Sequence, residues 1–181
     1  NPLLFVGDVH CVYEPGNNDA LDLMTTEAVV VRSVFSGSGD KGISVGESSD
    51  LFGVNNILID NQIGVQSKDA STAILFNQSF KNNGTALHAY KKNWQYGTGG
   101  TIFLGKSIVS GGKIAARAQK QSTIQLFDSF VEGRLGNKRI TLIDTDTNQK
   151  RDAKSDKYLP EHSLALPKIY AAVDRLTKEQ A

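Results

Sequence analysis

The chain has 181 residues, of which 39% are hydrophobic, and its 20 Lys and Arg residues against 19 Asp and Glu residues give a net charge of +1. This length suits one domain, and a charge so close to zero excludes general attraction to nucleic acid or to an anionic membrane. The single cysteine, Cys11, excludes an internal disulfide framework, and no apolar run is long enough for a membrane span.

The first residues, Asn1 to Phe5, have strand-like composition and do not resemble a signal peptide. We therefore expect the chain to be the C-terminal part of a longer protein. Residues 3–24 fit a first coil, in which two short apolar strands flank a turn rich in Pro, Gly and Asn.

A short strand-like phrase then recurs at a fixed spacing of 22 residues, and its central apolar residues are Leu21, Ile43, Val65 and Leu87. Such a period predicts a stacked solenoid in which each coil buries its core against its neighbours. Because side chains alternate along a strand, these four residues should face inward. The residues that follow them should form an outward row along one face: Asp22, Ser44, Gln66 and His88.

A second pattern lies between these phrases and begins at Arg32, Asn56, Asn77 and Gly105. It predicts that Phe35, Ile59 and Phe80 face inward three residues later in the first three coils. The Asn and Gly residues of the pattern suit the left-handed backbone of sharp corners. Asn61 and Asn82 are expected to stack as a side-chain ladder between neighbouring coils.

The later coils are less regular. An insertion, residues 91–100, precedes two further coils, and we place the end of the solenoid at residue 143. Residues 144–163 are polar and predict a linker, and residues 164–181 predict a C-terminal helix. In that helix Ile169, Val173 and Leu176 share one face, which would cap the open end of the last coil.

These features together resemble the right-handed parallel β-helix of the pectate-lyase-like superfamily, over residues 1–143. The expected fold is therefore all-β: one chain wound into about six coils of 22 residues, closed by a capping α-helix. The resemblance is specific for fold and not for activity, since this fold carries lyases, hydrolases, epimerases and inert surface proteins. It also implies an extracellular or cell-surface location.

The functional motifs that this chain resembles most are those of polygalacturonases, whose catalytic coils carry Asn-Thr-Asp-Gly-x-Asp and then Gly-Asp-Asp. The present chain has Asp19 within a similar phrase and Asp40 after a glycine, 21 residues later. The third acid of that family falls at Lys41, which cannot act as an acid, and the family's later His-Gly and Arg-Ile-Lys elements are absent. We interpret the match as shared coil structure, with Asp19 and Asp40 as turn residues.

Other candidates for chemistry surround the outward row. His88 could act as a base, and Asp22, Gln66, Lys68 and Tyr90 could contact a ligand. The acids Asp22, Asp40 and Asp69, with Lys41 and Lys68 as possible bases, have the residue types of a calcium-dependent lyase, but their spacing matches no lyase signature. The alternative interpretation is a solvated polar face.

The insertion carries the only tryptophan of the chain, Trp94, together with Tyr96. Aromatic rings can stack on sugars, so these residues are predicted to form one wall of a groove with Gln66 and His88 on its floor. The alternative is that Trp94 folds back over the end of the barrel.

One stretch imitates a calcium loop, with oxygen ligands offered by Asp144, Asp146, Asn148 and Asp152. A Gln replaces its required glycine and a Ser replaces its closing Glu, so a polar linker is the better interpretation. We expect no cofactor, with Ca²⁺ as the one possible ion.

Two functions follow from the sequence. The favoured one is a non-catalytic scaffold of a larger extracellular or surface protein, which contacts other domains of that protein and a polysaccharide. The alternative is an enzyme that modifies an acidic glycan as a lyase, hydrolase or epimerase. No nucleic-acid partner and no membrane span is expected.

Overall fold

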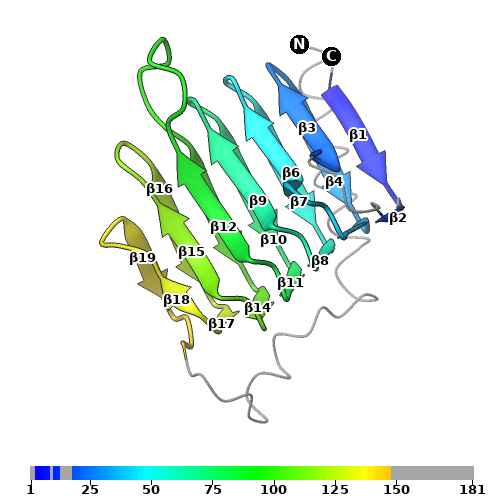
Figure 1. The fold of residues 1–181 in the computed structure, drawn as a ribbon, viewed down its shortest axis with the longest axis vertical. Coiled ribbons are helices and arrows are strands. Elements are labelled where there is room, and N and C mark those ends of the chain that lie inside the picture. Colours follow the sequence, from blue (N-terminus) through cyan, green and yellow to red (C-terminus); the bar gives the residue numbers. More distant parts are fainter. Residues whose placement is uncertain (1–2, 9, 13–17, 148–181) are drawn as a thin grey trace.

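The computed structural model describes residues 3–8, 10–12 and 18–147, and it shows a parallel β-solenoid of about six turns (Figure 1). Within these ranges the chain forms nineteen strands and no helix. Each turn contributes one strand to each of three sheets, and all strand pairings of the described residues are parallel. The predicted all-β parallel solenoid with 22-residue turns is therefore confirmed.

The three sheets are named here in the order in which the chain visits them. Sheet 1 has seven strands: β1 (Leu3–Gly7), β4 (Glu27–Val31), β7 (Asp50–Val54), β10 (Thr72–Phe76), β13 (Thr101–Gly105), β16 (Thr123–Phe127) and β19 (Ile140–Ile143). Sheet 2 has six strands: β2 (His10–Val12), β5 (Val34–Ser36), β8 (Ile57–Ile59), β11 (Ser79–Lys81), β14 (Ile108–Ser110) and β17 (Phe130–Val131). Sheet 3 also has six: β3 (Leu21–Met24), β6 (Lys41–Gly46), β9 (Ile63–Lys68), β12 (Thr85–Tyr90), β15 (Ile114–Ala118) and β18 (Arg134–Leu135).

One continuous apolar core fills the space between the sheets. In sheet 3, Ile43, Val65 and Leu87 are fully buried and stack in register, as predicted. Leu21 begins this stack and is partly buried, because it lies in the first turn and has a neighbouring turn on one side only. Adjacent strands of a sheet lie ~4.8 Å apart, so the seven strands of sheet 1 span about 29 Å along the solenoid.

The predicted register of sheet 2 is correct for Phe35 and Phe80 and wrong for Ile59. Leu58 is the fully buried residue of β8, and it pairs with both Phe35 and Phe80, whereas Ile59 is only partly buried. The strands of sheet 2 have three residues or fewer, which is too short for alternation to decide which of two adjacent apolar residues faces inward.

Left-handed backbone closes the corners, but at two positions one residue earlier than predicted. Asn77 has a φ of 54°, as expected for a corner, whereas positive φ falls on Asn55 (58°) and Asp60 (57°) in place of Asn56 and Asn61. Asn and Asp tolerate this conformation because their short polar side chains bond locally.

Asn61, which does not occupy the corner, forms hydrogen bonds inside the solenoid. Asn61 donates its side-chain N–H to Asn83 Oδ1 over 3.0 Å, and its own Oδ1 accepts the backbone N–H of Ser38 over 2.9 Å. Asn83 in turn donates to the carbonyl of Leu58 over 2.8 Å. The expected ladder of Asn61 with Asn82 is therefore wrong, and Asn83 is the partner, because the ladder satisfies buried backbone groups next to the corner.

The stacking continues slightly past the predicted boundary at residue 143. Asp146 forms a parallel bridge with Phe130, and the backbone N–H of Val131 donates to the carbonyl of Asp146 over 2.8 Å. The predicted C-terminal helix, residues 164–181, and most of the predicted linker lie outside the described residues.

Candidate functional site

The outer face of sheet 3 carries a row of polar side chains along the solenoid. Strand pairing places five residues side by side, and we call them the polar row: Asp22, Ser44, Gln66, His88 and Arg117. Alternation along the strands predicted the first four correctly. Arg117 was missed because the insertion after β12 lengthens the spacing from 22 residues to 29.

The polar row is exposed at its ends and buried in its middle. Asp22 and Arg117 are exposed and His88 is half-buried, whereas Ser44 is 0% and Gln66 is 3% exposed. Ser44 Oγ and Gln66 Oε1 have no hydrogen-bond partner among the described residues. Buried polar groups of folded proteins are normally hydrogen-bonded, so these two atoms mark the middle of the polar row as a candidate site.

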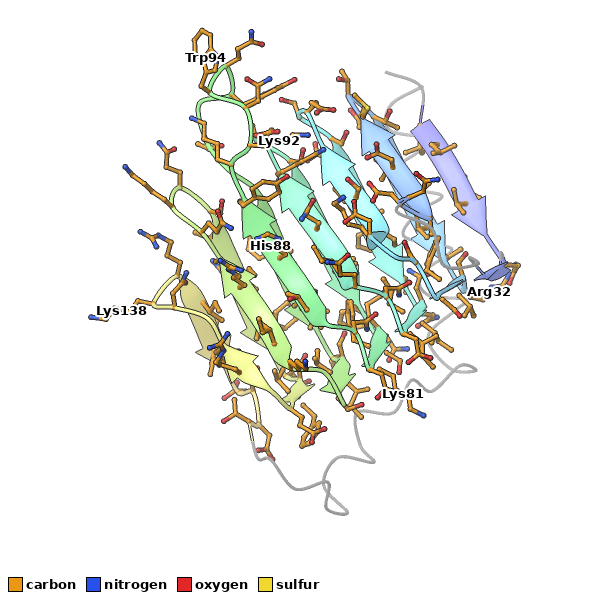
Figure 2. The ribbon with its side chains drawn as sticks, viewed as in Figure 1. Arg32, Lys81, His88, Lys92, Trp94 and Lys138 are labelled. Carbon is orange, nitrogen blue, oxygen red and sulfur yellow. The ribbon has the colours of Figure 1, made fainter. Side chains whose placement is uncertain are left out.

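His88 lies in the middle of this face (Figure 2) and is held on both sides. Gln66 Nε2 is 3.0 Å from Nδ1 of His88, and Gln119 Nε2 is 3.2 Å from its Nε2. The ring also stacks on Tyr90, with centroids 5.0 Å apart and planes inclined by 8°. A neutral imidazole has one N–H, so one amide donates to the ring while the other must accept from it through its oxygen.

The surroundings keep His88 uncharged. Burial lowers the pKa of His88 from 6.5 to about 4, and the positive charges of Arg117 and Lys41 add to this effect. The pKa of Tyr90 is raised, chiefly by burial, although Lys41 acts in the opposite direction. At neutral pH the pair is therefore an uncharged aromatic surface with hydrogen-bonding edges, and an imidazole with so low a pKa is a weak base.

Lys41 binds both acids that resemble those of polygalacturonases. Its Nζ lies 3.0 Å from Asp19 Oδ1 and also forms an ion pair with Asp40. Burial alone would lower the pKa of Lys41, but the hydrogen bonds and charges of Asp40 and Asp19 outweigh burial, so its pKa is raised. Lys41 is also close enough to His88 to lower the pKa of that ring.

The structure thus brings the four weak catalytic candidates onto one face, in an arrangement that suits ion pairing. Glycoside cleavage needs one protonated acid and one separate carboxylate. Here Asp19 and Asp40 both bond to a single ammonium group, so neither stands as a separate carboxyl group. Asp19 and Asp40 therefore fix the side chain of Lys41, and their role as turn residues stays a prediction.

Lys68, a predicted ligand-binding residue, is buried against neighbouring residues of the solenoid. It is 8% exposed, lies across Gly46, and places its Nζ 3.8 Å from Glu47 Oε1. A methyl group at position 46 would come within 2.3 Å of Lys68 Cε, so the lysine side chain would have to shift if position 46 were not glycine. Lys68 therefore contributes to the packing of the face and not to its exposed surface.

The insertion does not cover the polar row. Figure 2 shows Trp94 at the tip of the loop, beyond the end of the sheet and pointing away from His88, and the residue is 84% exposed. Tyr96 is half-buried. The predicted groove with Trp94 as a wall above His88 is therefore wrong, because the loop leaves β12 along the strand direction, and Trp94 does not fold back over the barrel end either.

The buried carboxylate of Asp69 fixes this loop, a contact that sequence reasoning did not predict. Asp69 is 0% exposed, and its Oδ1 accepts the backbone N–H groups of Lys92 and Asn93, each over 2.7 Å. Asp69 lies 23 residues before Lys92, one turn away in the solenoid, so the repeat spacing was the signal that could have identified the contact.

The predicted calcium loop is only partly described. Asp144 occupies a corner with a φ of 47°, and Asp146 is part of the bridge to Phe130, while Asn148 and Asp152 lie outside the described residues. No group of three or more His, Cys, Asp or Glu side chains in the described residues is arranged to hold a metal ion.

A family model described as "Periplasmic copper-binding protein (NosD)" matches residues 12–124, which is more than half of the chain. No curated protein matches the chain at a significant level. The family's description as periplasmic agrees with the expected location outside the cytoplasm. Among the described residues, no helix is long and apolar enough to cross a membrane.

The family description names copper, and whether this face fits copper depends on its donor atoms. Copper prefers imidazole, thiolate and thioether ligands. Both ring nitrogens of His88 face glutamine amides, and the described part of the sheet 3 face offers no second imidazole or thiolate beside it. The described side chains of this face therefore do not fit a copper site.

Proposed function

The chain belongs to the NosD family of right-handed parallel β-helices, and we propose that it is a non-catalytic scaffold domain that contacts a glycan through its polar row. The scaffold acts outside the cytoplasm, as the family description indicates for its members. Its rigid stack of turns presents side chains at a fixed spacing of ~4.8 Å, which is comparable with the length of one sugar unit.

The observation that carries this proposal is the fixed His88–Tyr90 pair. Gln66 and Gln119 orient the imidazole, and the two rings stack, so little side-chain freedom remains to be lost on binding. Uncharged rings with hydrogen-bonding edges suit sugars, which offer both hydroxyl groups and apolar C–H faces.

The charges around the pair favour a neutral or weakly charged glycan. Lys41 is neutralised by Asp19 and Asp40, and the exposed Asp22 and Arg117 at the two ends of the row have opposite signs. A strongly acidic polymer would need a clear excess of positive charge, which the described part of this face lacks.

The proposal is tested by titrating the protein with neutral and acidic oligosaccharides at millimolar concentration, with isothermal calorimetry and amide NMR shifts as readouts. We expect shifts confined to β9, β12 and β15, and weaker binding by about tenfold in His88→Ala, since a pair of lost contacts is worth roughly 1.4 kcal/mol. Lys106→Ala is the matched control, because Lys106 is exposed and pairs only loosely with Asp128, 3.5 Å away.

Each outcome separates the alternatives. If no oligosaccharide produces binding heat or amide shifts, the glycan contact is refuted and the scaffold role alone stands. The release of soluble product over time from a polyuronide would replace the proposal with the polysaccharide-modifying enzyme. Binding that His88→Ala and Lys106→Ala weaken equally would place the ligand elsewhere.

A further inference from the structure

The outer face of sheet 1 differs from any ordinary solvated surface, because two adjacent outward rows, one at the middle and one at the carboxyl end of the strands, are largely apolar. The first row follows strand pairing from β1 to β13: Phe5, Val29, Phe52, Ile74 and Phe103. The second row continues to β19 and is interrupted only by glycines: Gly7, Val31, Val54, Phe76, Gly105, Phe127 and Ile143. We call these two rows the apolar outer face.

The apolar outer face is separate from the core. Val29, Val31 and Val54 form their own buried cluster, with Phe52 packed against it, on the opposite side of the sheet from the inward stack. Phe5 is 53%, Ile74 is 45% and Ile143 is 49% exposed. A contiguous apolar surface of this kind normally has an occupant.

The chain itself supplies a segment with a matching surface. The described part ends at residue 147, shortly after β19, which is the last strand of this same sheet, and 34 residues follow it. In the sequence of that tail, Leu166, Ile169, Tyr170, Val173 and Leu176 recur at helical spacing. On a helix these five residues would form one apolar stripe roughly 120° wide, a width typical of helices that pack on a core.

Length and reach agree with this pairing. A helix from Leu166 to Gln180 would be about 22 Å long at 1.5 Å per residue. The first apolar row crosses five strands and spans about 19 Å. The residues between β19 and Leu166 could extend to roughly 60 Å or more, which is enough to return to any strand of sheet 1.

From these observations we infer that residues 166–180 form an amphipathic helix that packs along the apolar outer face, across the strands of sheet 1. This position differs from a cap on the last coil. The polar side of the helix, with Lys168 and Arg175, faces solvent, and the stripe from Leu166 to Leu176 covers the row that contains Ile74. The helix thereby protects this face from self-association.

The placement is tested by cysteine cross-linking in the full chain with Cys11→Ser. Val173 is the middle of the helical stripe and Ile74 lies in the middle strand of sheet 1, so their proximity does not depend on the direction of the helix. Val173→Cys is combined in turn with Phe52→Cys, Ile74→Cys and Phe103→Cys, which allows for a shift of one strand either way. Arg175→Cys with the same three partners is the matched control, because Arg175 lies on the opposite side of the helix.

We expect an intramolecular disulfide in at least one Val173 pair, with a yield independent of protein concentration, and a much lower yield in the Arg175 pairs. Disulfide-linked dimers whose yield rises with concentration would overturn the inference and assign the face to a second copy of the chain. Equal yields for Val173 and Arg175, or no disulfide in any pair, would also overturn it.

A second measurement does not require a cross-link. Ile169→Asp with Val173→Asp should release the helix without touching the solenoid, and hydrogen exchange should accelerate in β4 and β7 while β9 and β12 are unchanged. Lys168→Asp is the control and should leave all four strands unchanged. Unaltered exchange in the double variant would contradict the inference, whatever the variant does to solubility.

Discussion

Sheets 1 and 3 have the same construction and opposite outer faces. Both are parallel and both contribute every second residue to one core, yet sheet 3 shows the solvent side a polar row and sheet 1 shows it two apolar rows. The solenoid constrains only the inward residues, since these must stack on identical neighbours. The outward residues are free to specialise, so the faces rather than the fold carry the function.

The two faces also differ in how burial is satisfied. Val54 on sheet 1 and Ser44 on sheet 3 are almost equally inaccessible, at 1% and 0% exposure. Burying the valine is favourable by the hydrophobic effect, whereas the hydroxyl of Ser44 has no partner among the described residues. The apolar outer face therefore adds stability, and the middle of the polar row reduces it.

The largest effect is expected beneath the polar row, where Val65→Asp would place an unpaired carboxylate in the core. Val65 is 0% exposed and stacks between Ile43 and Leu87, so the free energy of unfolding should fall by at least about 3–5 kcal/mol. Chemical denaturation measures this change. Asp22→Asn, on the exposed end of the same sheet, should change stability by less than about 0.5 kcal/mol, and similar losses in both variants would mean that inward and outward positions are not distinguished.

The sequence predicted sheet 3 well because its long strands repeat the same phrase. Leu21, Ile43, Val65 and Leu87 occur at one spacing, and strands of up to six residues fix which side faces inward. The same reasoning failed at Ile59, where a three-residue strand offers two adjacent apolar residues.

The candidate site was predictable only where it follows the repeat. Asp22, Gln66 and His88 were found by spacing, whereas Gln119 reaches His88 from 31 residues away, across an insertion of unknown path. The exposed position of Trp94 could not be inferred either, because a loop without periodicity contains no signal for its direction.

The next prediction concerns the apolar outer face, where Val54→Thr keeps the shape of the side chain and adds a hydroxyl group. If the face is covered, that hydroxyl is buried without a partner, and the free energy of unfolding should fall by about 1–3 kcal/mol. Thr72→Val, in a partly exposed position of the same sheet, is the reverse change and should have almost no effect. If Val54→Thr leaves the free energy of unfolding unchanged, this face is hydrated, and the proposed difference between sheets 1 and 3 is wrong.

His88 should make the polar row sensitive to acid. Its pKa is lowered from 6.5 to about 4 in the folded protein, so the unfolded chain takes up the proton first as the pH falls. Stability supplied by the neutral ring is complete above pH 6.5 and is lost as the pH falls towards 4. Allowing for partial exposure, the loss is about 1–2 kcal/mol.

Denaturation midpoints at pH 7.5 and pH 4.5 measure this loss, with His88→Gln as the comparison because glutamine does not titrate. Other groups titrate equally in both proteins, so only the difference between them reports His88. A pH dependence that is the same in both would show that the ring is not desolvated and that the polar row is an ordinary wet surface.

The smallest effect is expected from Ser44→Ala, and its sign matters more than its size. Removing a well-bonded serine destabilises a protein, but Ser44 Oγ is buried without a partner among the described residues, so its removal should be neutral or should raise the free energy of unfolding by up to about 1 kcal/mol. Ser49→Ala is the matched control, since the Oγ of Ser49 donates to the carbonyl of Gly46 over 2.6 Å and accepts the backbone N–H of Thr26 over 3.1 Å. That variant should lose about 1–3 kcal/mol. If Ser44→Ala loses as much as Ser49→Ala, Ser44 has a hydrogen-bond partner in solution, and the contrast between a polar row that reduces stability and an apolar face that adds it no longer holds at this position.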